Sequence, residues 1–301
     1  MATTVTAPVG NTIALAERYL PILDEIYKAG AKSSILDTAA ERVRWEGAKK
    51  AYLFNTEMVG LAGYSRNAGF VPGDVNTGWE DYEITQDRGR SFMVDAMDND
   101  ETLGMAFGTL VGEFERTQVI PELDAYRFAK YAGAAAVSQV KTETPTAATI
   151  LGLIDDATAA LDDAEVPYEG RILFVNPNTY KFIKGGVTRM VMNRDDNVNY
   201  NVEMFNDMQV ITVPSGRFNT AVTINNSTTS AGAGGYTASG DAINYMIVHP
   251  SAILQVVKHQ IPRIFSPEVN QEADAWKFDY RGYHDCWVKD QKTNGIYVSH
   301  A

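Results

Sequence analysis

Cysteine is almost absent from this chain: Cys286 is the only cysteine among its 301 residues. A single thiol cannot close a disulfide within the chain, and it cannot supply a structural zinc site that needs two or more thiolates. We therefore expect a protein of a reducing compartment that is held together by its own apolar core or by neighbouring chains.

Long apolar runs and an excess of basic charge are also lacking. No stretch approaches the roughly 18 to 20 apolar residues that cross a bilayer, and the opening MATTVTAPVGNT lacks the basic flank and apolar core of a signal peptide. We expect no membrane partner. The 26 basic and 38 acidic residues give a net charge of -12, which disfavours proteins that grip nucleic acid through counterion release.

Motifs for catalysis and cofactors are missing as well. Gly235 and Gly240 have the spacing of a phosphate loop, but Asp241 and Ala242 stand where a lysine and a hydroxyl residue are required. The four histidines show no paired spacing of the kind that metal sites use. We predict no cofactor, no metal ion and no enzymatic activity.

One group of residues resembles a nucleophilic site, with a thiol, an imidazole and a carboxylate in Cys286, His284 and Asp285. On a strand, His284 and Cys286 share one face while Asp285 points to the other, so the three groups would not converge. We favour a small buried thiol and keep a cysteine-dependent hydrolase as a remote alternative.

The sequence does contain several extended elements. Residues 1–12 are small and polar and predict an arm, and 13–29 predict a short helix that Pro21 interrupts. Between Lys49 and Asp95, the strand-like segments AYLFNTEM and WEDYEIT flank several glycines, which predicts a long hairpin with an open tip. Because an isolated two-stranded ribbon is marginally stable in water, this hairpin should lean on something else.

A long helix is predicted to follow the hairpin. Asp98 as N-cap and Glu101 three residues later are close to a capping box, and apolar side chains recur at steps of three and four until about Ala136. The length, about 50 Å at 1.5 Å per residue, is that of a structural spine. Its other face is expected to carry the charged residues Glu113, Glu115, Arg116, Glu122, Asp124, Arg127 and Lys130.

Helix and strand alternate in the second half of the chain. Residues 146–165 predict a helix and RILFVNP a buried strand, whereas 225–241 are small and polar enough for an exposed loop. AINYMIVHPSAILQVVKHQIPRIFSP predicts a strand, a turn, a short helix and a strand, and the chain ends in aromatic-rich strands. The exposed edge strands of a hairpin have unpaired backbone groups that can pair with other chains and cause aggregation unless they are covered. We therefore predict a self-assembling structural protein whose hairpin lies across a neighbour.

The order of these elements resembles the major capsid proteins of tailed bacteriophages, which have the Hong Kong 97-type fold. The resemblance extends over nearly the whole chain from about residue 13, and its specificity comes from the combination and spacing of segments. Those segments are DYEITQDRGRSFMVDAMDNDET, VIPELDAYRFAKYA, GRILFVNPNTYKFI and INYMIVHPSAILQVVKHQIPRIFSP.

The resemblance implies an α+β fold with four parts. They are an N-terminal arm with a short helix (1–45), an extended β-hairpin loop (46–95), a peripheral domain with the long spine helix (96–140 and 246–301) and an axial domain (141–245). In this family the axial domain surrounds the symmetry axis of a hexamer or pentamer.

The resemblance also implies a function. Copies of the chain would form hexamers and pentamers of an icosahedral shell, the virion capsid, around double-stranded DNA that is not bound sequence-specifically. Assembly in the host cytoplasm, with scaffold, portal and decoration proteins as partners, is expected. No scaffolding region precedes the arm, so either a separate scaffold protein is used or the sequence is the mature form. An encapsulin-type compartment that encloses cargo enzymes is the alternative within this fold.

For the subunit contacts, we predict that the hairpin contacts the adjacent subunit and that Arg66 forms ion pairs with carboxylates on a neighbouring spine helix. A buried aromatic side chain contributes roughly 1.5 to 3 kcal/mol, whereas a surface ion pair contributes about 0 to 1 kcal/mol. The predicted hairpin residues are Tyr64, Arg66, Asn67, Phe70 and Trp79. The predicted spine residues are Glu113, Glu115, Arg116, Glu122 and Arg127.

Overall fold

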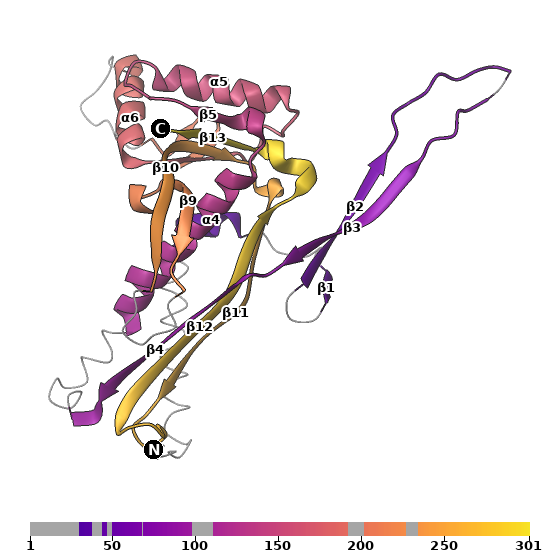
Figure 1. Ribbon diagram of the computed structural model, residues 1–301. Helices are drawn as coiled ribbons and strands as arrows, with labels where there is room; N and C mark the ends of the chain where they lie inside the picture. Colours follow the sequence, from indigo (N-terminus) through magenta and orange to yellow (C-terminus); the bar gives the residue numbers. More distant parts are fainter. Residues whose placement is uncertain are drawn as a thin grey trace.

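The computed structural model describes residues 30–37, 44–46, 50–67, 69–97, 111–191, 202–226 and 234–301. The predicted arm, the helix at 13–29 and the helix start at Asp98 lie outside these residues. The described strands form three sheets, and helices cover the largest of them (Figure 1). This agrees with the predicted mixture of helix and sheet.

The largest sheet, together with the helices that cover it, forms the part of the subunit that we call the body. Its strands are β5 (Val140–Thr142), β6 (Ile172–Val175), β7 (Met204–Phe205), β8 (Met208–Thr212), β9 (Asn219–Ile224), β10 (Tyr236–Val248) and β13 (Ile296–His300). They lie in the order β5-β13-β10-β6-β8-β7, with β9 paired to β10. The pairs β6–β8 and β5–β13 are parallel and the others antiparallel. β13 therefore joins this sheet, although the sequence placed residues 246–301 in another domain.

Helices cover both faces of the central sheet. The helices α5 (Ile150–Asp163) and α6 (Pro177–Val191) pack on one face and α4 (Ile120–Ala134) on the other. Successive side chains of a strand point to opposite faces, so Ile247 of β10 joins the cluster under α5 while Met246 joins the cluster under α4. All four residues of β6 are buried, as expected for a strand covered on both faces. The predicted helix at 146–165 and the predicted buried strand are confirmed.

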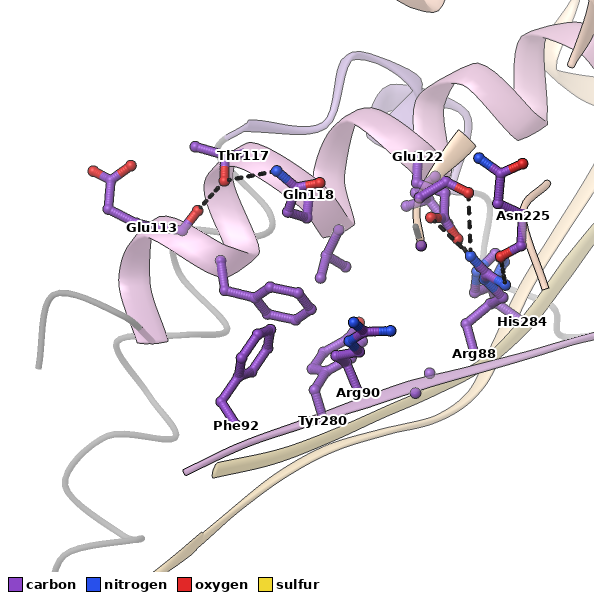
Figure 2. A pocket seen from close by; sticks show the side chains of 17 residues that line it. Arg88, Arg90, Phe92, Glu113, Thr117, Gln118, Glu122, Asn225, Tyr280 and His284 are labelled. Carbon is purple, nitrogen blue, oxygen red and sulfur yellow. Dashed lines mark hydrogen bonds and ion pairs between the residues drawn. The ribbon is translucent and has the colours of Figure 1, made fainter. Parts of the chain in front are cut away.

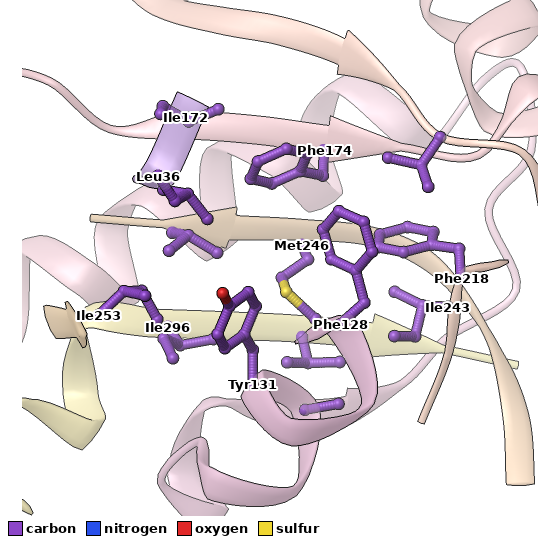
Figure 3. Close-up of a cluster of buried hydrophobic side chains, with 14 of the residues drawn as sticks. Leu36, Phe128, Tyr131, Ile172, Phe174, Phe218, Ile243, Met246, Ile253 and Ile296 are labelled. Atoms are coloured by element: carbon purple, nitrogen blue, oxygen red, sulfur yellow. The ribbon is translucent and has the colours of Figure 1, made fainter. Parts of the chain in front are cut away.

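Aromatic rings pack at the centre of the contact between α4 and the sheet. Phe128 of α4 points toward the sheet, and its ring centroid lies 5.1 Å from those of Phe174 and Phe218 (Figure 3). Leu36, from the short turn η1 (Lys32–Leu36), is fully buried in the same cluster. The segment that precedes the hairpin is therefore anchored in the core of the body.

A second sheet extends away from the body. Its strands are β4 (Gln86–Asp95), β11 (Ile253–Phe265) and β12 (Ala275–Val288), in the order β11-β12-β4. We call this antiparallel sheet the ribbon. The sequence placed β4 in the extended loop 46–95, but β4 pairs with β12 along its whole length. The reason is its inner face, where Phe92 and Val94 pack with Phe278 and Trp276.

The spine helix is described from residue 111 to Ala134, and it remains helical across Pro121. Proline has no N–H to donate to the carbonyl four residues earlier, and its ring crowds that carbonyl. A π-helical turn, η2 (Glu115–Val119), stands directly before α4, and the wider turn accommodates the change in the hydrogen-bond ladder. The predicted continuation of the helix past Pro121 is confirmed.

Shorter elements correct two further predictions. The segment 225–241 is not a loop throughout, because β10 begins at Tyr236, which pairs with Ile224. The short helix predicted after His249 is a single turn, η5 (Pro250–Ala252). The remaining short turns are η3 (Val137–Gln139), η4 (Ser215–Arg217) and η6 (Asp290–Gly295).

The third sheet is the hairpin, which projects from the body (Figure 1). β2 (Lys50–Met58) and β3 (Val75–Glu83) pair antiparallel over nine residues, and β1 (Arg44–Glu46) adds to the edge of β2. Both strand segments predicted from AYLFNTEM and WEDYEIT are confirmed, and the hairpin ends at Glu83.

Candidate assembly surfaces

The hairpin carries an apolar stripe on one of its two faces. Phe54 lies opposite Trp79, and Met58 lies opposite Val75. Because side chains on one face of a strand recur every second residue, these four side chains share a face. They are between 52% and 74% exposed, and the rings of Phe54 and Trp79 meet edge to face at 5.2 Å. The described part of the subunit leaves this stripe uncovered.

The opposite face of the hairpin is fixed to the ribbon at its base. Tyr82 packs with Leu254 and Trp287 of the ribbon. Glu80 accepts hydrogen bonds from Nδ2 of Asn55 at 2.7 Å and from the hydroxyl of Tyr82 at 2.6 Å. The base therefore holds the hairpin in a defined direction while the stripe on the other face stays open.

The tip of the hairpin, residues 59–74, is closed by local contacts. Ser65 and Gly69 exchange two backbone hydrogen bonds of 3.2 and 2.7 Å, and Gly69 has a φ of 79°, which glycine adopts without steric cost. The rings of Tyr64 and Phe70 pack against each other with centroids 4.9 Å apart. The tip thus presents a pair of aromatic rings at the far end of the projection.

All five hairpin residues that the sequence analysis selected lie exposed on this projection, and Phe70 is 87% exposed. Arg66 and Asn67 form the turn at its end. Their contact with another subunit stays a prediction. Sequence reasoning missed Phe54, Met58 and Val75, because their common face becomes visible only once the pairing of β2 with β3 is known.

Three of the selected spine residues have exposed or half-buried side chains. Glu113 and Arg116 are exposed and form an ion pair of 2.7 Å with each other. Glu122 accepts hydrogen bonds from Nε and Nη2 of Arg88 on β4, at 2.6 and 3.1 Å. The spine helix is therefore tied to the ribbon by a bidentate pair, which is the stronger form of an arginine–carboxylate contact.

The sequence placed Glu115 and Arg127 on the charged outer face of the spine helix. This prediction is wrong for both, because their exposed fractions are only 3% and 1%. Arg127 donates from Nη1 to Oγ of Ser33 at 3.0 Å and pairs with Asp37 at 3.3 Å. The buried Asp124 beside it accepts the backbone N–H of Ser33 at 3.1 Å and its hydroxyl at 2.8 Å. Burial raises the pKa of Asp37, which Arg127 partly offsets. The turn η1 covers this face of the helix, and its buried polar backbone needs these partners.

Cys286 and His284 lack the properties of a nucleophile and its base. Burial raises the pKa of the Cys286 thiol to about 12, so the thiolate that would attack a substrate is scarce at neutral pH. Burial also lowers the pKa of His284 to about 4. Asp285 accepts hydrogen bonds from the hydroxyls of Thr85, at 2.8 Å, and Tyr126, at 2.7 Å. These contacts support a structural role for all three residues.

A cavity of about 620 Å³ lies between the spine helix and the ribbon (Figure 2). Aromatic rings form part of its wall: Phe114 of the spine helix lies 4.8 Å from Phe92 and 5.9 Å from Tyr280 of the ribbon. Arg88 and Arg90 enter the cavity from β4. The cavity thus combines an aromatic wall with charged side chains.

Among the residues that the structure describes, no three or more histidine, cysteine, aspartate and glutamate side chains are grouped so as to hold a metal ion. No helix in the described ranges is both long and apolar enough to span a bilayer.

The sequence matches no family model, and it matches no curated protein. Solved structures, in contrast, match most of the chain. A chain of the bacteriophage PhiM1 mature capsid has a TM-score of 0.60 and 11% identity, covering 84% of this chain and 82% of that one. The capsid of cyanophage P-SCSP1u has a TM-score of 0.58 and 15% identity, covering 88% and 86%.

A virus-like particle from Pyrococcus furiosus is also similar, with a TM-score of 0.52 and 12% identity over 95% of this chain and 99% of that one. The chain therefore has the fold of phage capsid proteins and of this particle. The resemblance that the sequence indicated is confirmed at the level of the fold.

Proposed function

We propose that this chain is the major capsid protein of a tailed bacteriophage, and that its copies assemble as hexamers and pentamers into an icosahedral shell around double-stranded DNA. The fold match carries the proposal, because the chain aligns with phage capsid chains over more than four fifths of both partners. The predicted site residues then act as contacts between subunits and not as a catalytic site.

The hairpin supports the proposal on physical grounds. A two-stranded projection is marginally stable in water by itself, and its apolar stripe is exposed in the single subunit. Burying one such side chain contributes roughly 1.5 to 3 kcal/mol, so covering the stripe with a second copy is strongly favourable. Head-to-tail contacts of this kind close into rings when the rotation between copies permits.

The Hong Kong 97-type architecture is the finer assignment that we propose. The hairpin is the extended loop, the ribbon and spine helix form the peripheral domain, and the central sheet with α5 and α6 forms the axial domain. β4 then belongs to the peripheral domain because it pairs with β12, and β13 belongs to the axial domain because it pairs with β10. The two domains are interleaved in sequence and share the core under α4.

The charge balance supports enclosure of DNA without tight binding. A net charge of -12 repels phosphates on average, so a genome can be packed against the wall without adhering to it. We propose scaffold, portal and decoration proteins as further partners, the virion as the final location and the host cytoplasm as the place of assembly.

A shell that encloses protein cargo is the second candidate function. The virus-like particle from Pyrococcus furiosus favours it, since it aligns with 95% of this chain. The two candidates share the fold and the subunit contacts, and they differ in what the shell contains. Neighbouring genes for a terminase and a portal support the phage assignment, and a neighbouring gene for a cargo enzyme supports the compartment.

Negative-stain electron microscopy of the purified full chain, combined with light scattering, tests the proposed function. We expect hexamers, pentamers or closed particles of uniform diameter. A stable monomer at high protein concentration, with no larger species after scaffold protein is added, would contradict the proposal. If closed particles form, nuclease-protected DNA inside particles from infected cells separates the phage shell from the cargo compartment.

A further inference from the structure

We infer that Arg88 on β4 sets the angle between the ribbon and the body of each subunit, and through that angle the curvature of the assembled shell. This inference rests on the proposed function and deepens it, because it assigns a positioning role to one side chain inside the subunit. The proposed function concerns the contacts between subunits, whereas the role of Arg88 concerns the shape of the subunit that makes them.

The guanidinium of Arg88 joins the ribbon to three places on the body. Nε and Nη2 donate to the two carboxylate oxygens of Glu122 on α4, at 2.6 and 3.1 Å. Nη1 donates to the backbone carbonyl of Asn225, at 3.0 Å, and to Oδ1 of Asn226, at 2.8 Å, directly after β9. Nη2 also donates to the carbonyl of Gly235, at 3.4 Å, directly before β10. A guanidinium has five N–H groups in a fixed fork, so this side chain makes as many hydrogen bonds as it has N–H groups.

Close packing does not fix the angle at this point, because the cavity of about 620 Å³ lies between the spine helix and the ribbon. Arg88 reaches across from the ribbon to Glu122 at the edge of the cavity (Figure 2). Packed interiors resist displacement because their atoms are already in contact, and an open cavity offers no such resistance. Beyond the cavity, the ring of Phe114 packs against that of Phe92. The fork of Arg88 therefore limits how far the ribbon can rotate about this aromatic contact.

The contact of Arg88 defines a direction as well as a distance. The side chains of Arg88 and Glu122 are 21% and 17% exposed, so water and salt screen this pair less than a surface pair. A bidentate arginine–carboxylate contact adds geometric specificity to the attraction. The backbone acceptors are held in place too, because the N–H of Asn225 donates to the carbonyl of Gly235 at 3.0 Å. All these acceptors belong to parts of the body that are fixed by their own hydrogen bonds or helix.

The angle between ribbon and body matters for a shell because it repeats in every copy. In the proposed architecture, the body surrounds the symmetry axis of a ring and the ribbon lies toward its periphery. Whether head-to-tail contacts close depends on the rotation from one copy to the next. A small angular difference in each subunit therefore accumulates over many copies into a different diameter. Shells of uniform diameter need an angle that each subunit defines narrowly.

The test replaces Arg88 by lysine in the full chain. Arg88→Lys keeps the positive charge but replaces the planar fork by a single ammonium group. The matched control is Arg281→Lys. Arg281 also makes a bidentate contact, from Nε and Nη2 to the carboxylate of Asp87 at 2.9 and 2.6 Å. Both of these residues belong to the ribbon, on β12 and β4, so the control pair does not connect the ribbon to the body.

Spin labels on dissociated subunits measure the angle directly. Gln271→Cys, in the turn between β11 and β12, places one exposed label on the ribbon, and Asp163→Cys, at the end of α5, places another on the body. The native Cys286 is buried and does not take a label. By double electron–electron resonance, we expect the distance distribution to become about twofold wider in Arg88→Lys, because the directional fork is lost. Arg281→Lys should leave its width unchanged.

Electron microscopy of assembled particles gives the second readout. The spread of diameters should be about twofold larger for Arg88→Lys than for the unmodified chain, and Arg281→Lys should match the unmodified chain. Glu122→Gln should broaden the diameters as well. The double variant should broaden them no further than either single variant, because both substitutions act through one contact.

Three outcomes overturn the inference and leave the proposed function standing. The distance distribution of Arg88→Lys could equal that of the unmodified chain, whether or not the variant assembles. Arg281→Lys could broaden it by the same amount. Particles of Arg88→Lys could keep a uniform diameter although the distances have broadened, which would separate the angle from the curvature. Failure of the unmodified chain to form any oligomer would instead count against the proposed function itself.

Discussion

The body and the hairpin of this chain place similar side chains in opposite situations. In the body, Phe128, Phe174 and Phe218 are fully buried between α4 and the central sheet. In the hairpin, Phe54 and Trp79 are about half exposed although their rings pack against each other. The same kind of aromatic contact therefore stabilises the fold of one subunit in the body, while in the hairpin it leaves apolar surface exposed.

Under the proposed function, this difference predicts that folding and assembly depend on different residues of the chain. A core that is covered on both faces of its sheet contains the apolar area that a subunit needs for its own stability. The stripe and the tip add apolar area that the single subunit leaves in water. Substitutions in the body should therefore change the free energy of unfolding, and substitutions in the hairpin should change the yield of assembled particles.

The largest expected effect is that of Phe128→Ala. The substitution removes a fully buried ring that contacts Phe174 and Phe218, and Phe-to-Ala changes in cores cost about 3 to 5 kcal/mol. Urea unfolding of dissociated subunits should show this loss. A midpoint of unfolding equal to that of the unmodified chain would contradict the description of the α4 core.

A pH dependence of somewhat smaller size is expected from His284. Burial lowers its pKa to about 4 in the folded chain, against about 6.5 when unfolded. Between pH 6.5 and pH 4, His284 is protonated more readily in the unfolded chain than in the folded chain. The free energy of unfolding therefore decreases as the pH falls from 6.5 toward 4.

The measurement compares the free energy of unfolding of dissociated subunits at about pH 7 and pH 4.5 with that of the His284→Phe variant. Because carboxylates also titrate in this range, only the difference between the two proteins reports on His284. The unmodified chain should lose roughly 2 kcal/mol more than the variant. Equal losses would show that the side chain keeps its ordinary pKa.

An intermediate effect is expected at Asp285, which lies on β12 of the ribbon and contacts both the spine helix and the segment that connects β3 to β4. Its carboxylate accepts the N–H and the hydroxyl of Thr85, both at 2.8 Å, and the hydroxyl of Tyr126. Asp285→Asn leaves one acceptor oxygen for these donors and should cost about 2 kcal/mol. Thr85→Val removes a single donor and should cost less. The same urea titration checks both variants, and the reverse order would contradict this account.

Much of the fold follows from the sequence because its signals are local. The strands around AYLFNTEM and WEDYEIT, the buried strand of RILFVNP and the helix at 146–165 each have a periodicity that their own residues determine. The position of β4 does not follow in this way. Its sequence fits a hairpin arm, and only its distant partner, β12, places it in the ribbon.

The candidate site shows the same limit. Tyr64, Phe70 and Trp79 could be selected as exposed aromatic residues because a glycine-rich hairpin has little core of its own. Arg127 and Glu115 could not be recognised as buried, because a charged residue at helical spacing is normally solvated. The burial of Arg127 depends on η1, which lies about ninety residues earlier in the chain and supplies Ser33 as a partner.

The smallest expected effect on the stability of the subunit, and a large one on assembly, belongs to Phe70→Asp. Phe70 is 87% exposed at the tip, so a change of its side chain should leave the free energy of unfolding within about 0.5 kcal/mol of the original value. A carboxylate in its place cannot be buried against a neighbour without a large desolvation cost. We expect soluble, folded subunits that do not close shells in electron micrographs.

Asn76→Asp is the matched control, because it adds the same charge to an exposed position on the hairpin face opposite the stripe. Particles should form from this variant and not from Phe70→Asp. If both variants assembled normally, the tip would have no part in the contact between subunits. If both failed, added charge anywhere on the hairpin would explain the loss, and the aromatic side chain at the tip would have no special part in assembly.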